Sequence, residues 1–436
     1  MVGGALLSAQ ISTDTVRNIL RSRIDEHKRN VGLVVGIVDE SGKRVIVHGK
    51  RAAADARPLD GDTVFEIGSV TKAFTGLLLA DMAIRGEVSL DDPAQKYLPE
   101  GTAMPQRGGR AITLRDLATH HSGLPRLPGN LKPADPANPY ADYTPALLYE
   151  FLAGHALGRD PGAGYEYSNL GAGLLGHLLA RRAGKNYEEL LRERICDPLG
   201  MRDTRIALTP AMQARLAQGH GPDLQPAKNW DLDALAGAGA VRSTANDMLR
   251  LLDAAMAGKL GEKLERALAA RKPAGPSLTV GLGWHVFEGD REIVWHNGGT
   301  GGYRSFAGFA PKSGRGVVVL TNTFFSADDI GLHLLDPSRK LQEFRKEIVL
   351  PQTVLDRYTG RYSFAPGIVL GVTSESGRLF VQLTGQPRFE VFAESEKKFF
   401  LKVVEAQLTF ASEGDGKATA VTLHQNGRDQ LAKRME

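Results

Sequence analysis

Ser69 and Lys72 are the residues whose types and spacing most clearly suit chemistry; they lie in the segment Phe65–Leu77. A short apolar run ends at Gly68, and the apolar residues after it recur with the helical period. The sequence therefore predicts that Ser69 begins a helix. Residues three apart on a helix are neighbours, so an amine would lie beside the hydroxyl that it deprotonates. This arrangement suits a serine nucleophile with a lysine base, and a helix N-terminus adds free amides and positive potential.

The Ser-x-x-Lys spacing alone is not specific, because a chain of this length and ordinary composition contains it about once or twice by chance. Ser395-Glu396-Lys397-Lys398 is a second copy, in a charged segment between strand-like runs that is typical of a solvated turn. The spacing by itself fits a structural serine as well as a nucleophile. The assignment of Ser69 depends on partners elsewhere in the chain.

The composition is that of a globular protein, with 42% apolar and 24% charged residues, and the length of 436 residues predicts two or more domains. No apolar run is long enough for a transmembrane segment. The 54 basic and 50 acidic residues are interspersed and give a net charge of +4. Without a basic stripe, the sequence does not suggest a nucleic-acid partner.

The single cysteine, Cys196, lies in a mostly apolar stretch and is expected to be a small buried hydrophobic residue. It cannot form an internal disulfide, so cysteine content does not indicate the compartment. Met1–Gln10 is weakly apolar, lacks a basic start and is short for a signal peptide. The location therefore stays open: periplasmic or secreted if a signal peptide was removed, and cytoplasmic otherwise.

The first three hundred and fifty residues predict an α+β fold. An amphipathic helix, Thr13–Arg29, precedes a hairpin formed by Val31–Asp39 and Arg44–Gly49. Helices are then expected at Thr113–Ser122, Thr144–His155, Gly173–Arg182, Tyr187–Ile195 and Thr244–Ala257. Strands follow at Leu282–Phe287, Glu292–His296, Tyr303–Ala310 and Gly316–Thr321, with a last helix near Gln342–Ile348. This order predicts an antiparallel sheet, flanked by helices and a helical subdomain, whose first and last strands lie together.

From about Leu355 the pattern changes to short alternating runs with polar turns, which predict an all-β barrel or sandwich. The expected strands are Arg357–Phe364, Ile368–Ser374, Leu379–Leu383, Phe389–Ala393, Phe399–Val404, Gln407–Phe410 and Thr419–Gln425. The predicted organisation is a tail at 1–12, a first domain at 13–350 and a small β-barrel at 351–436.

Tyr167 and Asn169 lie in a glycine-rich loop, Pro161–Leu170, that leads into a helix. Two residues apart in an extended segment, their side chains point the same way. A tyrosine beside a lysine ammonium can become a phenolate and relay a proton, and an asparagine amide can hold a substrate carbonyl. The alternative is a buried tyrosine with a satisfied hydroxyl, followed by an asparagine that caps the helix.

The next six residues, Gly171–Gly176, match the G-x-G-x-x-G pattern of dinucleotide-binding proteins. They follow a loop and not a strand, and no βαβ unit surrounds them. We interpret these glycines as positions of close helix packing, and no cofactor is expected.

A strand at Ile293–Tyr303 breaks into glycines after His296. Backbone exposed at Gly298 and Gly299 would let a substrate lie along the strand, and amide groups there could form an oxyanion hole with the amide of Ser69. His296 could hold a substrate carboxylate or adjust the pKa of the tyrosine, although a lone histidine is more often structural.

The sequence lacks the motifs of other hydrolytic enzymes. The G-x-S-x-G pattern of α/β-hydrolases is absent, and so is H-E-x-x-H. The histidines do not have metal-ligand spacing beside carboxylates, and His120 and His121 are typical of a helix end with a glycine cap. No metal is expected.

Three motifs in order, Ser69-Val70-Thr71-Lys72, Tyr167-Ser168-Asn169 and His296-Asn297-Gly298, closely resemble those of the penicillin-recognising serine hydrolases. The resemblance is to the class C β-lactamase branch, which includes D-alanyl-D-alanine carboxypeptidases, D-aminopeptidases and β-lactamase-like (family VIII) carboxylesterases. It covers about Thr13–Ile348, with further matches at Leu117–Leu124 and Asp197–Met201. The segment from Leu355 resembles the lipocalin-like domain appended to some relatives, where it borders the substrate cleft or makes subunit contacts, so a homo-oligomer is one expectation.

The resemblance implies Ser69 as the acylated nucleophile, Lys72 as its base and Tyr167 as the residue that shuttles the proton and activates the deacylating water. Asn169 would bind the substrate amide, and the amides of Ser69 and Gly299 would form the oxyanion hole. His296 stands where β-lactamases carry a lysine. A histidine at this position is similar to the H-x-G motif of the carboxypeptidases, aminopeptidases and many esterases of the branch.

The implied function is hydrolysis of carboxylic esters or D-amino-acid peptides through an acyl-enzyme, with slower β-lactam hydrolysis and without metal or cofactor. A dedicated class C-like β-lactamase is the second reading. The reading from another class is a catalytically silent penicillin-binding or scaffold protein, in which the three residues only bind.

Overall fold

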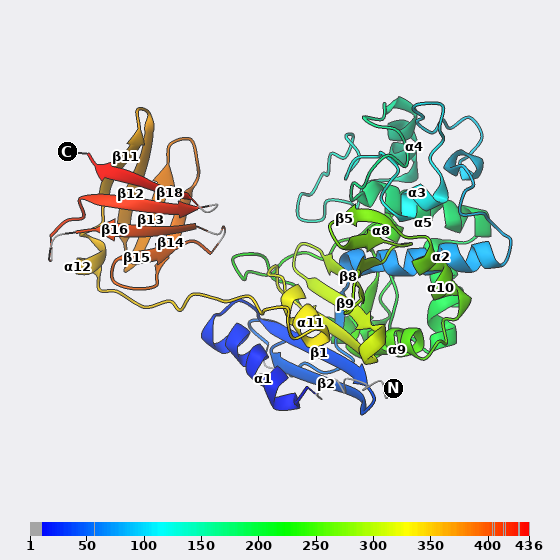
Figure 1. Cartoon of the computed structure of the whole chain (residues 1–436), viewed down its shortest axis with the longest axis horizontal. Coiled ribbons are helices and arrows are strands. Elements are labelled where there is room, and N and C mark those ends of the chain that lie inside the picture. Colours follow the sequence, from blue (N-terminus) through cyan, green and yellow to red (C-terminus); the bar gives the residue numbers. More distant parts are fainter. Residues whose placement is uncertain are drawn as a thin grey trace, which may run out of the picture. The chain divides into compact units, whose positions relative to one another are not determined.

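The computed structural model describes residues 11–435 except 56, 403, 405, 413, 415, 426 and 427. Residues 1–10 of the expected tail lie outside the described part of the chain. The chain divides into two compact units, residues 1–342 and 343–436. The first contains helices and strands, and the second is almost entirely β-structure (Figure 1).

An eight-stranded antiparallel sheet forms the framework of the first unit, in the order β2-β1-β10-β9-β8-β7-β6-β5. β1 pairs with β2 on one side and β10 on the other, which confirms that the first and last strands lie together. The strands are β1 (Gly32–Asp39), β2 (Gly42–Gly49), β5 (Lys272–Gly275), β6 (Leu278–Val280), β7 (His285–Phe287), β8 (Ile293–Gly299), β9 (Arg304–Ala310) and β10 (Arg315–Thr321). A separate two-stranded sheet pairs β3 (Val64–Glu66) with β4 (Arg242–Thr244).

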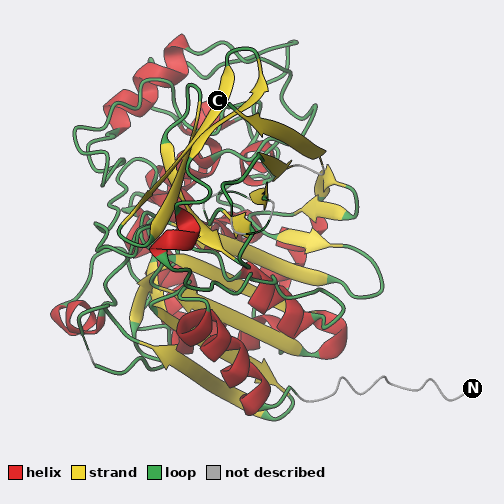
Figure 2. Cartoon of the chain, turned by 90° about the vertical axis from the view of Figure 1, so that its left-hand side faces the viewer, coloured by secondary structure: helices red, strands yellow, loops and turns green. Residues whose placement is uncertain are grey.

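Helices cover both faces of the large sheet (Figure 2). Successive side chains of a strand point to opposite faces, and β1 shows this directly. Leu33, Val35 and Ile37 pack with α1 and α11, whereas Val34 and Val38 pack with the larger core that contains α2 and α9. The helices are α1 (Thr13–Arg21), α2 (Thr71–Ile84), α3 (Leu114–Ala118), α4 (Pro145–Gly154), α5 (Asn169–Ala183), α6 (Tyr187–Leu191), α7 (Pro210–Arg215), α8 (Ala236–Gly239), α9 (Ala245–Met256), α10 (Glu262–Ala269) and α11 (Asp328–Leu335).

Helix α2 is buried on every side, from Thr71 to Met82. A helix without a polar face suits the interior of a fold, and α2 packs among β8, α5, α8 and α10. Its first turn is therefore fixed by the surrounding core, which gives a rigid support for any chemistry at that end.

The helix predicted near Gln342–Ile348 is wrong. The last helix of the first unit is α11, where Ile330 and Leu334 pack onto the sheet, while residues 341–350 form neither helix nor strand. Leu341, Phe344 and Ile348 recur with helical spacing, but most of the segment is exposed, so a helix there would gain little from packing. Residues 343–350, placed at the end of the predicted first domain, instead belong to the second unit, within which Arg345 pairs with Glu394.

The second unit is a closed antiparallel barrel of eight strands, which confirms the predicted all-β domain. After a short helix, α12 (Gln352–Leu355), the strands are β11 (Gly360–Ala365), β12 (Ile368–Glu375), β13 (Arg378–Leu383), β14 (Arg388–Ala393), β15 (Lys398–Phe400), β16 (Ala406–Ala411), β17 (Ala420–Gln425) and β18 (Arg428–Arg434). Seven strands were predicted, and β18 was missed because it is strongly polar and buries only Ala432 in the core. β18 closes the barrel against β11. Tyr358, Tyr362, Phe399 and Phe410 fill the interior.

Candidate active site

Ser69 lies in a single 3₁₀ turn, Gly68–Val70, between β3 and α2. Lys72 follows on the buried first turn of α2, with 1% of its surface exposed. The predicted shared face is present, since Lys72 Nζ lies 3.0 Å from Ser69 Oγ. An amine and a hydroxyl are therefore in hydrogen-bond contact at the edge of a rigid core.

Lys72 has two further contacts, from segments far away in the sequence. Nζ donates to Oδ1 of Asn169, the first residue of α5, at 2.8 Å, and to the backbone oxygen of Ala238, in α8, at 2.7 Å. Both of these oxygens can only accept hydrogen bonds. Asn169 is thus placed where it was predicted, with its amide nitrogen left to donate elsewhere.

The protonation state of Lys72 follows from its surroundings. Burial lowers the pKa of the Lys72 amine well below its ordinary value, and the positive charge of Arg126 lowers it further. In its neutral form the amine has two N–H groups and one lone pair, and the oxygens of Asn169 and Ala238 can take both N–H groups. In that form the lone pair faces the Ser69 hydroxyl 3.0 Å away and can accept its proton.

Tyr167 directly precedes the N-cap of α5, Ser168. The Tyr167 hydroxyl forms a hydrogen bond with the Ser69 side chain, and Lys72 Nζ lies 4.9 Å from the centre of its ring. Burial raises the pKa of Tyr167, and the weaker influences of the Ser69 contact and of Arg126 oppose the rise. This direction is opposite to the expected one, because the loss of solvent around the phenol outweighs the influences that lower its pKa.

Three histidine rings surround Tyr167. The ring centres of His120, His285 and His296 lie 4.5, 6.3 and 6.2 Å from that of Tyr167. Burial lowers the pKa of all three, that of His285 to about 4. The phenol is thus enclosed by uncharged rings. Sequence reasoning missed His120 and His285 as neighbours of Tyr167, because their spacing along the chain carries no signal.

His296 differs from its expected role. Its Nδ1 lies 2.6 Å from the backbone oxygen of Asn297, which requires a proton on Nδ1 and leaves the lone pair on Nε2. Nε2 is buried and has no hydrogen-bond partner among the described residues. A neutral ring that offers an acceptor is unsuited to holding a carboxylate. Its position beside Tyr167 fits the other reading, an influence on the phenol.

Glycines at the end of β8 let two backbone segments meet. A Cβ on Gly298 would lie 2.0 Å from the carbonyl oxygen of Ile67, and one on Gly68 would lie 2.6 Å from the backbone nitrogen of Gly299. Gly68 also has a φ of 47°, which favours glycine. Strand β8 is therefore fixed against the turn that carries Ser69. Gly299 lines the pocket there, whereas Gly298 is a packing contact.

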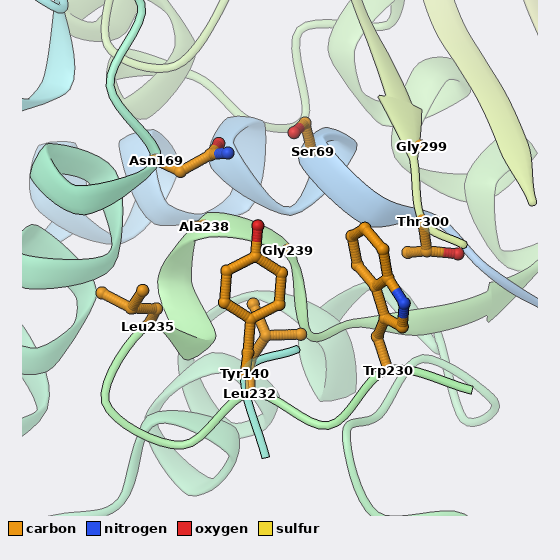
Figure 3. Close-up of a pocket in the computed structure, with 10 residues that line it drawn as sticks. All are labelled: Ser69, Tyr140, Asn169, Trp230, Leu232, Leu235, Ala238, Gly239, Gly299 and Thr300. Carbon is orange, nitrogen blue, oxygen red and sulfur yellow. The ribbon is translucent and has the colours of Figure 1, made fainter. Parts of the chain in front are cut away.

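A small pocket, about 30 Å³ in volume and open to solvent, lies in front of Ser69 (Figure 3). Ser69 and Asn169 turn their polar ends toward one another on one side of it, and Tyr140, Trp230 and Leu235 form the opposite side. The rings of Tyr140 and Trp230 meet edge to face, with their centres 5.3 Å apart. The pocket thus places apolar and aromatic side chains beside the hydroxyl.

Trp230 is presented by a segment without helix or strand, residues 216–235, and is held through its backbone. Its N–H donates to Glu66 Oε1 at 2.9 Å, and its carbonyl oxygen accepts from Arg242 Nη2 at 2.9 Å. Glu66 and Arg242 face one another across β3 and β4. Sequence reasoning missed these contacts, because among Glu66, Trp230 and Arg242 only Glu66 lies near a recognised motif.

The remaining sequence features have structural roles. Gly176 lies where an added Cβ would be 2.7 Å from the Cα of Gly237, which confirms that these glycines pack α5 against α8. Cys196 is buried and Ser395 lies in an exposed turn, both as predicted.

Among the described residues there is no group of three or more His, Cys, Asp or Glu side chains that could hold a metal ion. No helix in the described ranges has the length and apolar character that a membrane span requires.

Residues 16–336 match the family described as Beta-lactamase, and residues 345–434 match a domain of unknown function, DUF3471. Penicillin-binding protein 4* of Bacillus subtilis (strain 168) is 27% identical over 437 residues, which cover 91% of this chain and 94% of that protein. The D-alanyl-D-alanine-carboxypeptidase/endopeptidase AmpH of Escherichia coli (strain K12) is 30% identical over 309 residues, 66% of this chain and 78% of that protein.

Two solved structures are also similar. A beta-lactamase/D-alanine carboxypeptidase from Yersinia pestis, complexed with citrate, has a TM-score of 0.61 and 27% identity and covers 74% of this chain and 97% of its own. The octameric penicillin-binding protein homologue from Pyrococcus abyssi has a TM-score of 0.67 and 20% identity, and covers 97% of this chain and 100% of its own. The second likeness is one of fold.

The fold, the site and these similarities together define a serine hydrolase that acts through an acyl-enzyme. The chain belongs to the beta-lactamase family, whose profile covers most of the first unit.

Proposed function

We propose that this enzyme hydrolyses carboxylic esters or D-amino-acid peptides, with Ser69 as nucleophile, Lys72 as base and Tyr167 as proton donor. One observation carries the proposal. Lys72 Nζ lies 3.0 Å from Ser69 Oγ and 2.8 and 2.7 Å from two carbonyl oxygens, so the amine in its neutral form can direct its lone pair at the hydroxyl.

Acylation follows from these positions. Ser69 Oγ attacks the substrate carbonyl carbon while its proton passes to Lys72 Nζ, which removes the need for a separate histidine base. The backbone N–H groups of Ser69 and Gly299 stabilise the oxyanion, and the Asn169 amide nitrogen binds a substrate carbonyl. When the bond to the leaving group breaks, Tyr167 donates its proton to the departing oxygen or nitrogen. The Lys72 ammonium then returns a proton to the phenolate.

Deacylation reverses the proton path. Water attacks the acyl carbon and gives up a proton to the Tyr167–Lys72 pair, and Ser69 Oγ recovers a proton as the acid is released. Water can approach because the pocket is open to solvent. The neutral histidines give Tyr167 surroundings of low polarity. In such surroundings the proton transfers among Tyr167, Lys72 and Ser69 are strongly coupled.

The substrate class is inferred from the shape of the pocket and from the relatives. Apolar side chains beside Ser69 suit a short acyl group, and several relatives are described as D-alanyl-D-alanine carboxypeptidases or beta-lactamases. His296, buried and neutral, replaces the cation that would attract the carboxylate of a β-lactam. We therefore rank esters and D-peptides above β-lactams.

Hydrolysis of p-nitrophenyl butyrate by the wild type and Ser69→Ala tests the proposal. We expect kcat to fall by about 10⁴ or more in Ser69→Ala. Intact mass after mixing with a fluorescent penicillin separates the alternatives. Rapid loss of the adduct indicates a β-lactamase, slow loss together with fast ester turnover supports the proposal, and a persistent adduct without turnover indicates a silent binding protein.

The domain boundaries and the assembly stay predictions. We propose that residues 1–342 carry the activity, because Ser69, Lys72, Tyr167 and the pocket all lie within that unit. The barrel core contains none of these residues. A homo-oligomer would be detected by light scattering of the full chain.

A further inference from the structure

An exposed arginine lies beside Tyr167. The guanidinium carbon of Arg126 is 5.1 Å from the centre of the Tyr167 ring. The backbone oxygen of Arg126 accepts hydrogen bonds from the amides of Asn169 at 3.0 Å and Leu170 at 3.2 Å. The loop that carries Arg126 is thereby tied to the start of α5. The backbone of Arg126 is therefore fixed beside Asn169 and Leu170, within reach of Tyr167.

The guanidinium of Arg126 has no ion pair and no hydrogen bond within the described part of the chain. The neighbouring basic side chains already have partners: Lys72 Nζ donates to the oxygens of Asn169 and Ala238, and Arg304 Nη1 donates to the backbone oxygens of Thr300 and Tyr303. His296 is neutral. Arg126 therefore keeps its hydrogen-bond donors available to a ligand at the mouth of the site.

The position of Tyr167 indicates the side of the cleft on which Arg126 acts. The apolar pocket that suits the acyl group is lined by Ser69, Tyr140 and Trp230 but not by Tyr167. Tyr167 contacts Ser69 from outside that pocket and is the group that would protonate the departing atom. A cation stacked beside Tyr167 therefore lies near the leaving group.

We propose that Arg126 binds a carboxylate carried by the leaving group of the substrate and so selects substrates whose departing half is anionic. A guanidinium matches a carboxylate with two parallel hydrogen bonds, which neither the single nitrogen of Lys72 nor the ring of His296 can supply. The inference rests on the proposed function and deepens it. It transfers the carboxylate-binding role from His296, where the sequence placed it, to a residue outside the three motifs.

Two esters with the same acyl group test the proposal: the butyrate of 3-hydroxybenzoic acid, and the butyrate of its methyl ester. They differ by one negative charge on the leaving group. The measured quantity is the ratio of kcat/KM for the charged ester to that for the neutral ester. We expect this ratio to fall about tenfold in Arg126→Gln and further in Arg126→Glu, while Arg126→Lys keeps part of it. Arg21→Gln, an exposed arginine on α1, is the matched control and should leave the ratio unchanged.

A second pair of esters tests which side of the substrate carries the recognised charge. The p-nitrophenyl monoester of succinic acid carries a carboxylate on the acyl side and is compared with p-nitrophenyl butyrate. Arg126→Gln should not change the ratio of kcat/KM for the succinate monoester to that for p-nitrophenyl butyrate. An unchanged ratio for the leaving-group pair, or a larger change for the acyl-side pair, would overturn the proposal. Failure of the proposed function is distinguishable, because ester hydrolysis would then be equal in wild type and Ser69→Ala, and both proposals would fall.

Discussion

Lys72 Nζ lies 4.9 Å from the centre of the Tyr167 ring, and burial moves the pKa values of the two groups in opposite directions. The amine loses its proton more readily and the phenol holds its proton more firmly. Burial therefore favours a neutral amine and a protonated phenol, both next to Ser69. Base and acid are present in the required states without a phenolate at rest.

The activity should depend on pH through Lys72. Because only the neutral amine can accept the Ser69 proton, kcat/KM for p-nitrophenyl butyrate should fall as pH drops through the lowered pKa of Lys72. Activity should still be present well below the ordinary pKa of lysine, about 10.4. Lys72→Arg keeps a positive charge without a lone pair and should be inactive at every pH tested. Activity in Lys72→Arg would refute the base assignment.

The same burial predicts a pH-dependent stability. Between the lowered folded pKa of Lys72 and its unfolded value, the unfolded chain binds more protons, so the free energy of unfolding rises with pH in that window. Lys72→Met removes the titrating group. Urea denaturation of both proteins should show the wild type gaining stability relative to Lys72→Met as pH rises toward about 10. A difference that stays constant with pH would mean that the lysine is charged in the folded state.

Glu66→Gln should alter acyl selectivity. The substitution keeps the oxygen that accepts from the Trp230 N–H but removes the charge opposite Arg242, which loosens the wall of the pocket. We expect the preference for p-nitrophenyl butyrate over the acetate to fall about threefold, a loss of the size expected for one weakened hydrogen bond. Trp230→Ala should reduce the same preference, and the double variant should be no worse than Trp230→Ala alone. Additive losses would show that Glu66 acts independently of Trp230.

Gly298→Ala should displace the turn that carries Ser69. The new methyl would lie 2.0 Å from the Ile67 oxygen, so the turn that carries Ser69 must shift. A loss of about 1–3 kcal/mol in stability and a large loss of kcat are expected. Gly154→Ala, at the end of α4 with open space around it, is the control and should affect neither quantity. Full activity in Gly298→Ala would contradict the close approach of the two backbones.

Local patterns predicted the parts of the fold and site that depend on neighbours in sequence. The hairpin before Ser69 follows from strand alternation and a Ser-Gly turn, and the shared face of Ser69 and Lys72 follows from helical spacing. Tyr167 and Asn169 were identified together because they flank the start of one helix. Each of these signals lies within a few residues of the group that it predicts.

Other parts depend on contacts between distant segments, which a single sequence does not encode locally. Trp230 and Arg126 come from segments without regular structure, and their places are set by Glu66, Arg242 and the backbone of α5. The polar strand β18 gains its structure by closing the barrel and not from its own pattern. Such elements are fixed by tertiary pairing, which overrides local preference.

Mass spectrometric mapping of the trapped acyl group tests the central claim most directly. The wild type is quenched in acid within seconds of mixing with a fluorescent penicillin, digested, and its labelled peptide sequenced. The account predicts a label on Ser69, and none in Ser69→Ala or Lys72→Arg. A label on another residue, or an equal label in Lys72→Arg, would contradict it.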